Sequence, residues 1–266
     1  MAQALSSGDI ENGFDESRQA YLLSHSQREV QRMKNQHEWV KTAFGGLIKA
    51  PIDYEKKDQS ILDSATADGD PELYPPSHLL PSNVQLVPGD LLTSLPDSWT
   101  RNFDLVHQRF VFPGIPSEAF HDALWKLMEC VKPGGWIQLV EPLAGENVSG
   151  PGPSAFAVLH RLANKFMKSS NIEQRITSRL QEGGFININV QMMDIVLGKS
   201  QQNKELDVRG RKTMRAALVN MSSMTNAKEM GMSDEEWGSL MERFDRDMMT
   251  FCIAVRHVII WAQRPE

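Results

Sequence analysis

A histidine and an arginine stand two positions apart at the end of an apolar segment. Residues 103–107 predict a strand that His107 ends, and Arg109 follows directly. A histidine at the end of a strand can act as a general base for an oxygen or nitrogen nucleophile. The competing interpretation is a ring that is satisfied by local backbone groups. Arg109 either binds a substrate carboxylate or pairs with a surface acid.

Three further side chains have types that can do chemistry. Tyr74 and His78 lie in a proline-rich segment, and Glu141 ends a later apolar strand. Glu141 either faces a substrate or caps the next loop. Methionines gather in the second half of the chain, where they fill the core or line an adaptable apolar substrate pocket.

The elements that must position these residues alternate between strands and helices. Lys132-Pro133-Gly134-Gly135 ends a helix before an apolar strand. The alternation predicts an α/β fold with an open, doubly wound, Rossmann-like sheet. The element order also pairs the last strand, antiparallel, with the strand at 185–196 at one edge. Strands are expected at 60–63, 84–87, 103–107, 136–140, 185–196 and 251–261, and helices at 17–44, 118–131, 156–166, 172–182, 206–221 and 235–247.

Length, charge and cysteine usage limit the class of protein. The chain has 266 residues, which suits one large α/β domain, and we expect a disordered start at 1–16 and one domain at 17–266. The net charge of −6 opposes binding to nucleic-acid phosphates. No apolar run approaches the roughly 20 residues that cross a membrane, and the start has no signal-peptide pattern. Cys130 and Cys252 have no paired spacing and lie in apolar runs, so we expect a cytoplasmic protein with two buried free thiols and no metal.

Five stretches, in this order, resemble fungal methyltransferases of the LaeA-like (UMTA) group, which are class I S-adenosylmethionine-dependent enzymes. Residues 29–46 are similar to the N-terminal helix of that group, 61–69 to its motif I, and 83–90 to the stretch that approaches the adenine. Residues 103–109 resemble the fourth strand, and 127–141, with its Lys-Pro-Gly-Gly-Trp sequence, resemble the next helix and the fifth strand. The resemblance is good over 17–142 and rests on element order beyond.

The resemblance implies a cofactor, a substrate class and a site. S-adenosylmethionine is expected across the carboxyl ends of the strands, where a motif I loop lets the backbone approach a nucleotide-like ligand closely. The substrate is expected to be a small fungal secondary metabolite under a helical cover within 145–250. The cofactor-binding residues implied are Asp63, Ala65, Ala67, Gly69, Asp90 and Leu91, with His107 as the catalytic residue.

The chain departs from the motif I pattern at two positions. Ala65 and Ala67 stand where the family has glycine, and a positive φ would cost alanine on the order of 1 kcal/mol or more. Asp68 adds a negative charge beside the loop. The close approach of a cofactor is therefore impaired rather than abolished.

The segment after motif I allows two interpretations. Gly69 runs directly into a proline-rich stretch, so the first crossover helix and the second strand are absent in the interpretation we favour. By spacing alone, Asp90 lies 21 positions after Gly69, which would make 84–87 the second strand and Asp90 the ribose ligand. An exposed sheet edge left by a missing strand would favour a homodimer.

Two functions follow. The first is an S-adenosylmethionine-dependent enzyme that methylates a small molecule. The alternative is a catalytically inactive pseudo-methyltransferase, an accessory or binding protein of the same pathway. Methyl transfer asks little of side chains beyond holding the nucleophile in line, so cofactor binding distinguishes the two.

Overall fold

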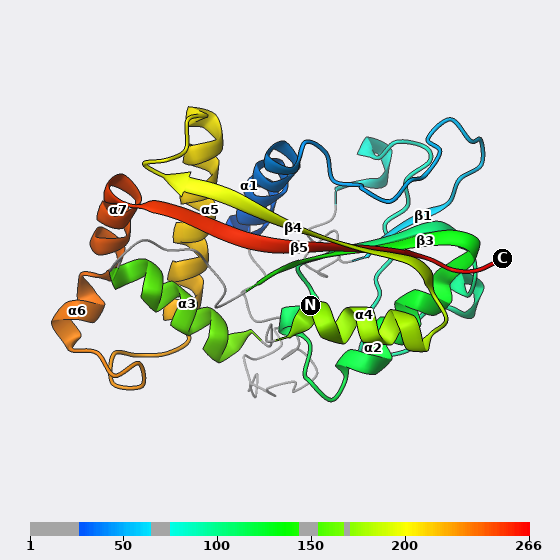
Figure 1. Cartoon of the computed structure of the whole chain (residues 1–266). Helices are drawn as coiled ribbons and strands as arrows, with labels where there is room; N and C mark the ends of the chain where they lie inside the picture. Colours follow the sequence, from blue (N-terminus) through cyan, green and yellow to red (C-terminus); the bar gives the residue numbers. More distant parts are fainter. Residues whose placement is uncertain (1–26, 65–74, 144–153, 168–170) are drawn as a thin grey trace, which may run out of the picture.

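The computed structural model describes residues 27–64, 75–143, 154–167 and 171–266 of the chain. Its centre is a five-stranded sheet with the strand order β1-β2-β3-β5-β4 (Figure 1). The strands β1, β2 and β3 are parallel, whereas β5 is antiparallel to both β3 and β4. The strands are β1 (Ile61–Ser64), β2 (Phe103–Arg109), β3 (Val131–Pro142), β4 (Ile186–Gly198) and β5 (Cys252–Gln263).

Helices pack on both faces of this sheet. One buried cluster joins α2 and α4 to Ile137 and Val258, and a second joins α1, α3, α5 and α7 to Val140 and Ile259. Because neighbouring residues of a strand point to opposite faces, these clusters are the two halves of a doubly wound core. The helices are α1 (Gln27–Phe44), α2 (Phe120–Cys130), α3 (Ser154–Phe166), α4 (Ile172–Glu182), α5 (Lys204–Ser222), α6 (Asp234–Gly238) and α7 (Leu240–Thr250).

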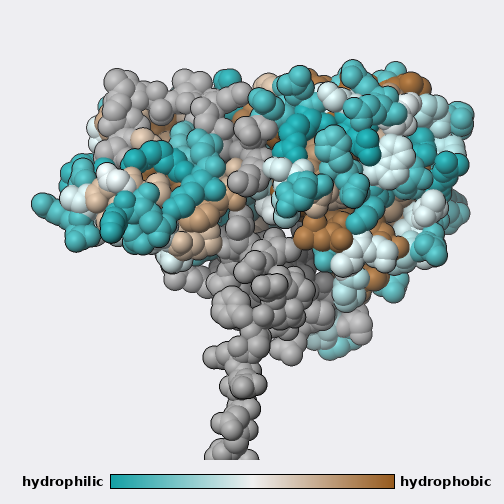
Figure 2. Space-filling view, turned by 90° about the horizontal axis from the view of Figure 1, so that it is seen from below, coloured by the Kyte–Doolittle hydropathy of each residue, from teal (hydrophilic) through white to brown (hydrophobic). Residues whose placement is uncertain are grey.

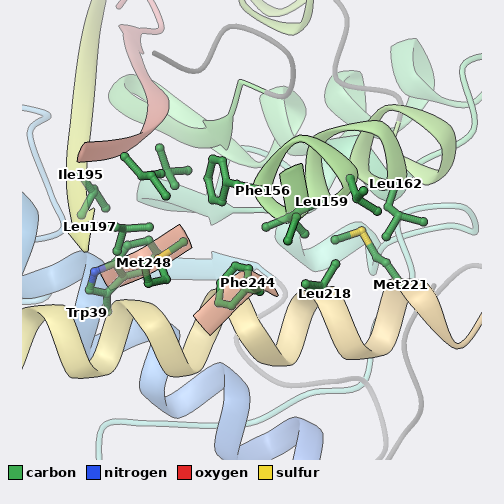
Figure 3. Packing of buried hydrophobic residues seen from close by; sticks show 14 of the residues in the cluster. Trp39, Phe156, Leu159, Leu162, Ile195, Leu197, Leu218, Met221, Phe244 and Met248 are labelled. Atoms are coloured by element: carbon green, nitrogen blue, oxygen red, sulfur yellow. The ribbon is translucent and has the colours of Figure 1, made fainter. Parts of the chain in front are cut away.

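The larger cluster brings together four helices from both ends of the chain. Figure 3 shows Trp39 of α1, Phe156 of α3, Leu218 of α5 and Phe244 of α7 around one apolar interior. All four side chains are fully or almost fully buried. Burial of a large apolar side chain stabilises a fold by about 1.5–3 kcal/mol relative to exposure, so this cluster fixes α1 on the sheet.

The predicted element order is largely confirmed. The strand expected at 185–196 is β4, and it pairs antiparallel with the last strand, as expected. The expected helix at 172–182 matches α4, and the Ser233 capping box opens α6. The expected helix at 235–247 is split into α6 and α7 at Ser239.

The strand expected at 84–87 is wrong. The structure places no strand there, and Val84 and Val87 are 44% and 40% exposed. In the described part of the connection from β1 to β2, which excludes 65–74, the chain has short 3-10 helices but no α-helix or strand. Among the described strands, β1 pairs with β2 alone and lies at the end of the sheet. The interpretation in which Asp90 ends a second strand therefore loses its strand.

Polar contacts tie β1, β2 and β3 together at their amino ends. The Asp104 carboxylate accepts hydrogen bonds from Lys132 Nζ at 2.8 Å and from the Ser60 N–H at 3.0 Å. Gly134 has a φ of +73°, and a Cβ on Gly135 would lie 3.0–3.1 Å from three backbone carbonyls. The two glycines thus allow the chain to enter β3 directly beside β2, and the opposite, carboxyl ends of the strands stay free for a site.

The surface combines polar side chains with exposed apolar ones such as Leu79 and Met249. Cys130 is buried as expected, whereas the prediction that Cys252 is buried is wrong, because it lies exposed at the start of β5. Figure 2 shows hydrophilic side chains over much of the described part of one face. No helix among the described residues combines the length and apolar character needed to span a membrane.

Candidate active site

Parallel pairing gathers polar side chains at the carboxyl ends of β1 and β2. Asp63 lies opposite His107, and Ser64 lies opposite Gln108. Arg109 closes β2, opposite Val140 of β3. Because the carboxyl ends of parallel strands meet at one edge, this is where an open α/β sheet binds its ligands.

Asp63 and His107 form a direct pair. His107 Nδ1 lies 2.7 Å from Asp63 Oδ1, and the His107 ring is buried, whereas the Asp63 side chain is 53% exposed. An ionised carboxylate only accepts hydrogen bonds, so Nδ1 carries the proton of the neutral ring. His107 Nε2 then presents a lone pair. It is buried and has no hydrogen-bond partner among the described residues.

The expectation that backbone groups satisfy the ring is therefore wrong, because the partner of His107 is the Asp63 side chain. A histidine oriented by a carboxylate, with its other nitrogen free, is the arrangement of a general base.

Arg109 is held beside this pair by α1. Its Nη2 donates to His37 Nδ1 at 3.1 Å, and its guanidinium lies 5.6 Å from the centroid of the Phe110 ring. Burial lowers the pKa of His37, and the positive charge of Arg109 lowers it further. The ring of His37 is therefore a neutral acceptor that orients the guanidinium without neutralising it. Arg109 Nη1 is buried and has no partner among the described residues.

Gln108 of β2 and Ser64 of β1 form a second side-chain pair beside that of His107 and Asp63. Gln108 is fully buried, and its Nε2 donates to Ser64 Oγ at 3.3 Å. The Gln108 Oε1 atom is buried without a described partner. Successive residues of a strand point to opposite faces of the sheet, so the Asp63–His107 and Ser64–Gln108 pairs place polar groups on both faces at the ends of β1 and β2.

Glu141 holds the turn that follows β2. Its Oε1 accepts hydrogen bonds from the N–H groups of Val111 and Phe112 at 3.3 and 3.2 Å. The turn begins at Phe110, whose φ of +62° is uncommon for a residue other than glycine. Glu141 is fully buried, and this burial raises the pKa of its carboxyl group to about 8. Glu141 thus caps a loop, as one of its two interpretations had it, although the loop is 110–112 and not the following one.

His257 of β5 packs against the same turn. Its register partner is Pro142 at the end of β3, and its ring centroid lies 5.4 Å from that of Phe110. Burial lowers the pKa of His257 to about 4, so the ring is neutral at physiological pH. Its Nδ1 atom is buried without a described partner.

Five of the eleven buried side-chain polar atoms that lack a partner among the described residues lie at one end of the sheet. The large majority of buried side-chain polar atoms in native proteins have a hydrogen-bond partner. Here three consecutive residues of β2 each carry a buried polar atom without a described partner, and two more such atoms lie on the adjoining ends of β3 and β5. The five atoms are His107 Nε2, Gln108 Oε1, Arg109 Nη1, Glu141 Oε2 and His257 Nδ1. A polar ligand at the ends of β1 and β2 would satisfy His107 Nε2 and Arg109 Nη1, which lie on the same face of β2, whereas Gln108 Oε1 lies on the opposite face.

The other predicted site residues either lie outside the described part of the chain or make contacts elsewhere. Ala65, Ala67 and Gly69, like Tyr74, lie outside the described residues. The Asp90 carboxylate accepts a hydrogen bond from the Leu92 N–H at 2.8 Å, and the Leu91 carbonyl accepts one from Lys126. Neither contact joins them to His107, so their role in binding a cofactor stays a prediction.

His37, Gln108 and His257 were missed by the sequence reasoning. Gln108 had a usable signal, since it stands between two candidate residues at a strand end. His37 and His257 had none, because their contacts depend on how α1 and β5 pack.

The chain is similar to known methyltransferases over almost its whole length. The N-methyltransferase verN of Clonostachys rogersoniana is 53% identical over 279 residues, which cover 97% of this chain and 96% of verN. The N-methyltransferase sirN of Leptosphaeria maculans is 26% identical, covering 92% and 95% of the two chains. The N-methyltransferase gliN of Aspergillus fumigatus is 24% identical, covering 97% and 98%. No family model matches the chain.

Solved structures are similar at a greater distance. A SAM dependent methyltransferase from Archaeoglobus fulgidus covers 90% of this chain and 95% of its own, with 11% identity and a TM-score of 0.39. The phosphoethanolamine N-methyltransferase 2 of Haemonchus contortus, solved with S-adenosyl-L-methionine, covers 63% of this chain and 34% of its own, with 16% identity and a TM-score of 0.34.

The sheet, with its polar site at the carboxyl ends of the parallel strands, is that of a Rossmann-like methyltransferase. More narrowly, the chain belongs to the fungal methyltransferase family that includes verN.

Proposed function

We propose that this protein transfers a methyl group from S-adenosylmethionine to a nitrogen atom of a small molecule in fungal secondary metabolism. The nitrogen acceptor is supported by the verN, sirN and gliN relatives, all of which are named N-methyltransferases. The run of three buried, unpaired polar atoms on His107, Gln108 and Arg109 carries the proposal for the site. We also propose membership of the LaeA-like group and a cytoplasmic location.

The polar groups at the ends of β1 and β2 suit the proposed cofactor. S-adenosylmethionine supplies a methyl group that its sulfonium already activates. Asp63 has an exposed carboxylate, and Gln108 Oε1 and Ser64 Oγ accept hydrogen bonds, which suits hydroxyl and ammonium donors. Together with Ala65, Ala67, Gly69, Asp90 and Leu91, these residues form the proposed binding surface.

His107 would take the proton of the acceptor nitrogen. The N–C bond would form as the bond between the methyl carbon and the sulfonium sulfur breaks, with its electron pair left on sulfur, and the N–H proton would move to the Nε2 lone pair of His107. The Asp63 carboxylate keeps Nδ1–H oriented and stabilises the positive charge that the ring gains. A base matters most for an amide nitrogen, because an amide is a poor nucleophile while it keeps its proton.

The shortened motif I region is part of this proposal. The match to verN spans 279 positions, more than the 266 residues of this chain, so verN has residues within the matched stretch, at positions that the overall match does not specify, that this chain lacks. The described part of the connection between β1 and β2 has no crossover helix. Both observations support a missing βα unit, and the exposed edge of β1 that results supports the proposed homodimer.

Calorimetric titration with S-adenosylmethionine and S-adenosylhomocysteine tests cofactor binding. We expect saturable binding, and at about 100 times the dissociation constant either ligand should stabilise the fold by roughly 2.7 kcal/mol. Folded protein that shows neither heat nor a thermal shift would contradict the enzyme and leave the inactive accessory protein in its place.

Variants of His107 test the base. His107→Ala should keep cofactor affinity and lower the formation of S-adenosylhomocysteine about 10²- to 10⁴-fold, measured with a panel of small amines and amides. His121→Ala, on α2, is the matched control. Activity retained by His107→Ala would remove His107 from the mechanism but keep the methyltransferase.

A further inference from the structure

Arg109 is a cation whose charge has no anionic contact within the described part of the chain. Its guanidinium is largely buried, and burial lowers its pKa. The ion pairs of the described residues do not include Arg109; its contacts there are the neutral His37 ring and the face of Phe110. A largely buried charge without a counter-ion is costly, so a fold that keeps one usually has an anion to place beside it.

The Asp63 carboxylate lies near Arg109 but is not its direct counter-ion. Its carboxylate raises the pKa of Arg109 through space, yet its short contact is to His107 Nδ1 at 2.7 Å. When His107 takes a proton, the Asp63 charge is needed there. The Arg109 Nη1 atom therefore stays free for a second anion.

The planar shape of the Arg109 guanidinium favours a carboxylate as that anion. Two parallel N–H groups match the two oxygens of a carboxylate, and the other edge is already held by His37 at 3.1 Å. His37 comes from α1, which the Trp39 and Val40 side chains anchor in the core. The guanidinium is thus oriented before any ligand arrives.

The distance between Arg109 and His107 indicates which molecule carries this carboxylate. The two residues are two apart on one strand, so their side chains leave the same face of β2 about 6–7 Å apart. In S-adenosylmethionine three carbon atoms separate the sulfur from the carboxylate. A methyl group aimed at a nitrogen beside His107 therefore places the carboxylate of the same molecule within reach of Arg109.

We infer that Arg109, oriented by His37, binds the methionine carboxylate of S-adenosylmethionine. The inference rests on the proposed function, since it assumes that the cofactor binds at the ends of β1 and β2. It makes Arg109 a residue that anchors the amino-acid end of the cofactor, which matters because alanines occupy the motif I positions.

A pair of ligands that differ only in the carboxylate tests the inference. The dissociation constants of S-adenosylmethionine and decarboxylated S-adenosylmethionine are measured by calorimetry for the parent protein and for Arg109→Gln. We expect the variant to bind S-adenosylmethionine about 10- to 100-fold more weakly and the decarboxylated ligand as the parent does. Arg109→Lys, which keeps the charge and loses the fork, should fall between the two.

Arg215→Gln is the control, because Arg215 pairs with Asp245 on the surface, on α5. Unchanged binding of the decarboxylated ligand also shows that Arg109→Gln is folded. An equal loss for both ligands, or none for either, overturns the inference and assigns Arg109 to a structural or substrate-binding role. A parent protein that binds neither ligand overturns the proposed function as well, so the two failures are distinguishable.

Discussion

At the scale of residues, the candidate site depends on which atoms lack partners. His107 has a carboxylate on one nitrogen and nothing described on the other. We interpret a buried polar side chain whose hydrogen-bonding groups all have partners as structural. One that keeps a buried group without a partner can bind a ligand through that group. The same distinction separates Arg109 from Arg256, which binds both oxygens of Asp194.

Asp63→Asn tests whether the pair acts as a unit. A neutral amide can still accept the Nδ1 proton but cannot stabilise a positive ring, so we expect kcat at saturating cofactor to fall about 10- to 1000-fold. Because Asp63 also belongs to the proposed cofactor-binding surface, we expect weaker binding of S-adenosylmethionine as well, which calorimetry measures separately. The measurement is the rate of S-adenosylhomocysteine formation by the two single variants and the double variant. Residues that act together are not additive, so adding Asp63→Asn to His107→Ala should cost no further activity. Additive losses would mean that Asp63 serves the cofactor independently.

The sequence could predict the identity of the site only in part. The strand ends that carry Asp63 and His107 follow from apolar patterns, and their parallel pairing follows from the fold class. The contacts of Arg109 with His37 and of Phe110 with His257 could not be predicted, because they join residues 72 and 147 positions apart through the packing of α1 and β5. Tertiary packing, not local pattern, decides them.

At the scale of elements, the turn after β2 controls where the site residues point. The left-handed Phe110 follows Arg109 directly, and the next two N–H groups are buried against Glu141. Phe110 also donates its own N–H to the Val140 carbonyl at 2.9 Å. The end of β2 is thus fixed from β3, and a loss of Glu141 should loosen the strand end that carries Arg109.

Substitutions of Glu141 test this support by thermal unfolding. Glu141→Leu removes the acceptor of two buried N–H groups, each of which costs about 1–3 kcal/mol when unpaired. The two groups together cost about 2–6 kcal/mol, so at roughly 2–4 °C per kcal/mol for a chain of this size the melting temperature should fall by about 4–24 °C. Glu141→Gln keeps an acceptor oxygen and should melt close to the parent near pH 6. Equal losses for the two variants would show that the carboxyl group does not support the turn through Oε1.

A strand-like sequence does not form a strand where no neighbouring strand is available to pair with it. Residues 84–87 have the composition of a strand, but Val84 N–H instead bonds to the Pro81 carbonyl in a turn. A strand needs a partner edge as well as apolar residues, and Pro81 and Pro88 flank this stretch. The segment at 185–196 also alternates between apolar and polar residues, and it forms a strand because β5 lies beside it as a partner.

At the scale of the whole molecule, two buried titratable groups at the same end of the sheet make stability depend on pH in opposite directions. The raised pKa of Glu141, about 8, means that the folded state holds a proton which the unfolded chain releases near pH 4.5. Its contribution is therefore full below about pH 4.5 and is lost as the pH rises towards 8. His257 behaves in the opposite way, since its pKa falls to about 4 in the folded protein.

His257→Gln tests the acid side of this balance. Between about pH 6.5 and 4 the unfolded chain binds a proton that folded His257 refuses, so the parent loses stability as the pH falls through that window. The difference is limited to roughly 3 kcal/mol, or several degrees in melting temperature. His257 packs against Trp39, Phe44 and Phe110, so the variant will be less stable at pH 7.5. That deficit should shrink steadily on acidification to pH 4.5, measured as the difference in melting temperature between variant and parent at each pH. A deficit that is the same at every pH would mean that the folded protein accommodates a charged ring at position 257. The acid sensitivity of the molecule would then have to come from its paired carboxylates, of which Asp104 and Asp194 have lowered pKa values.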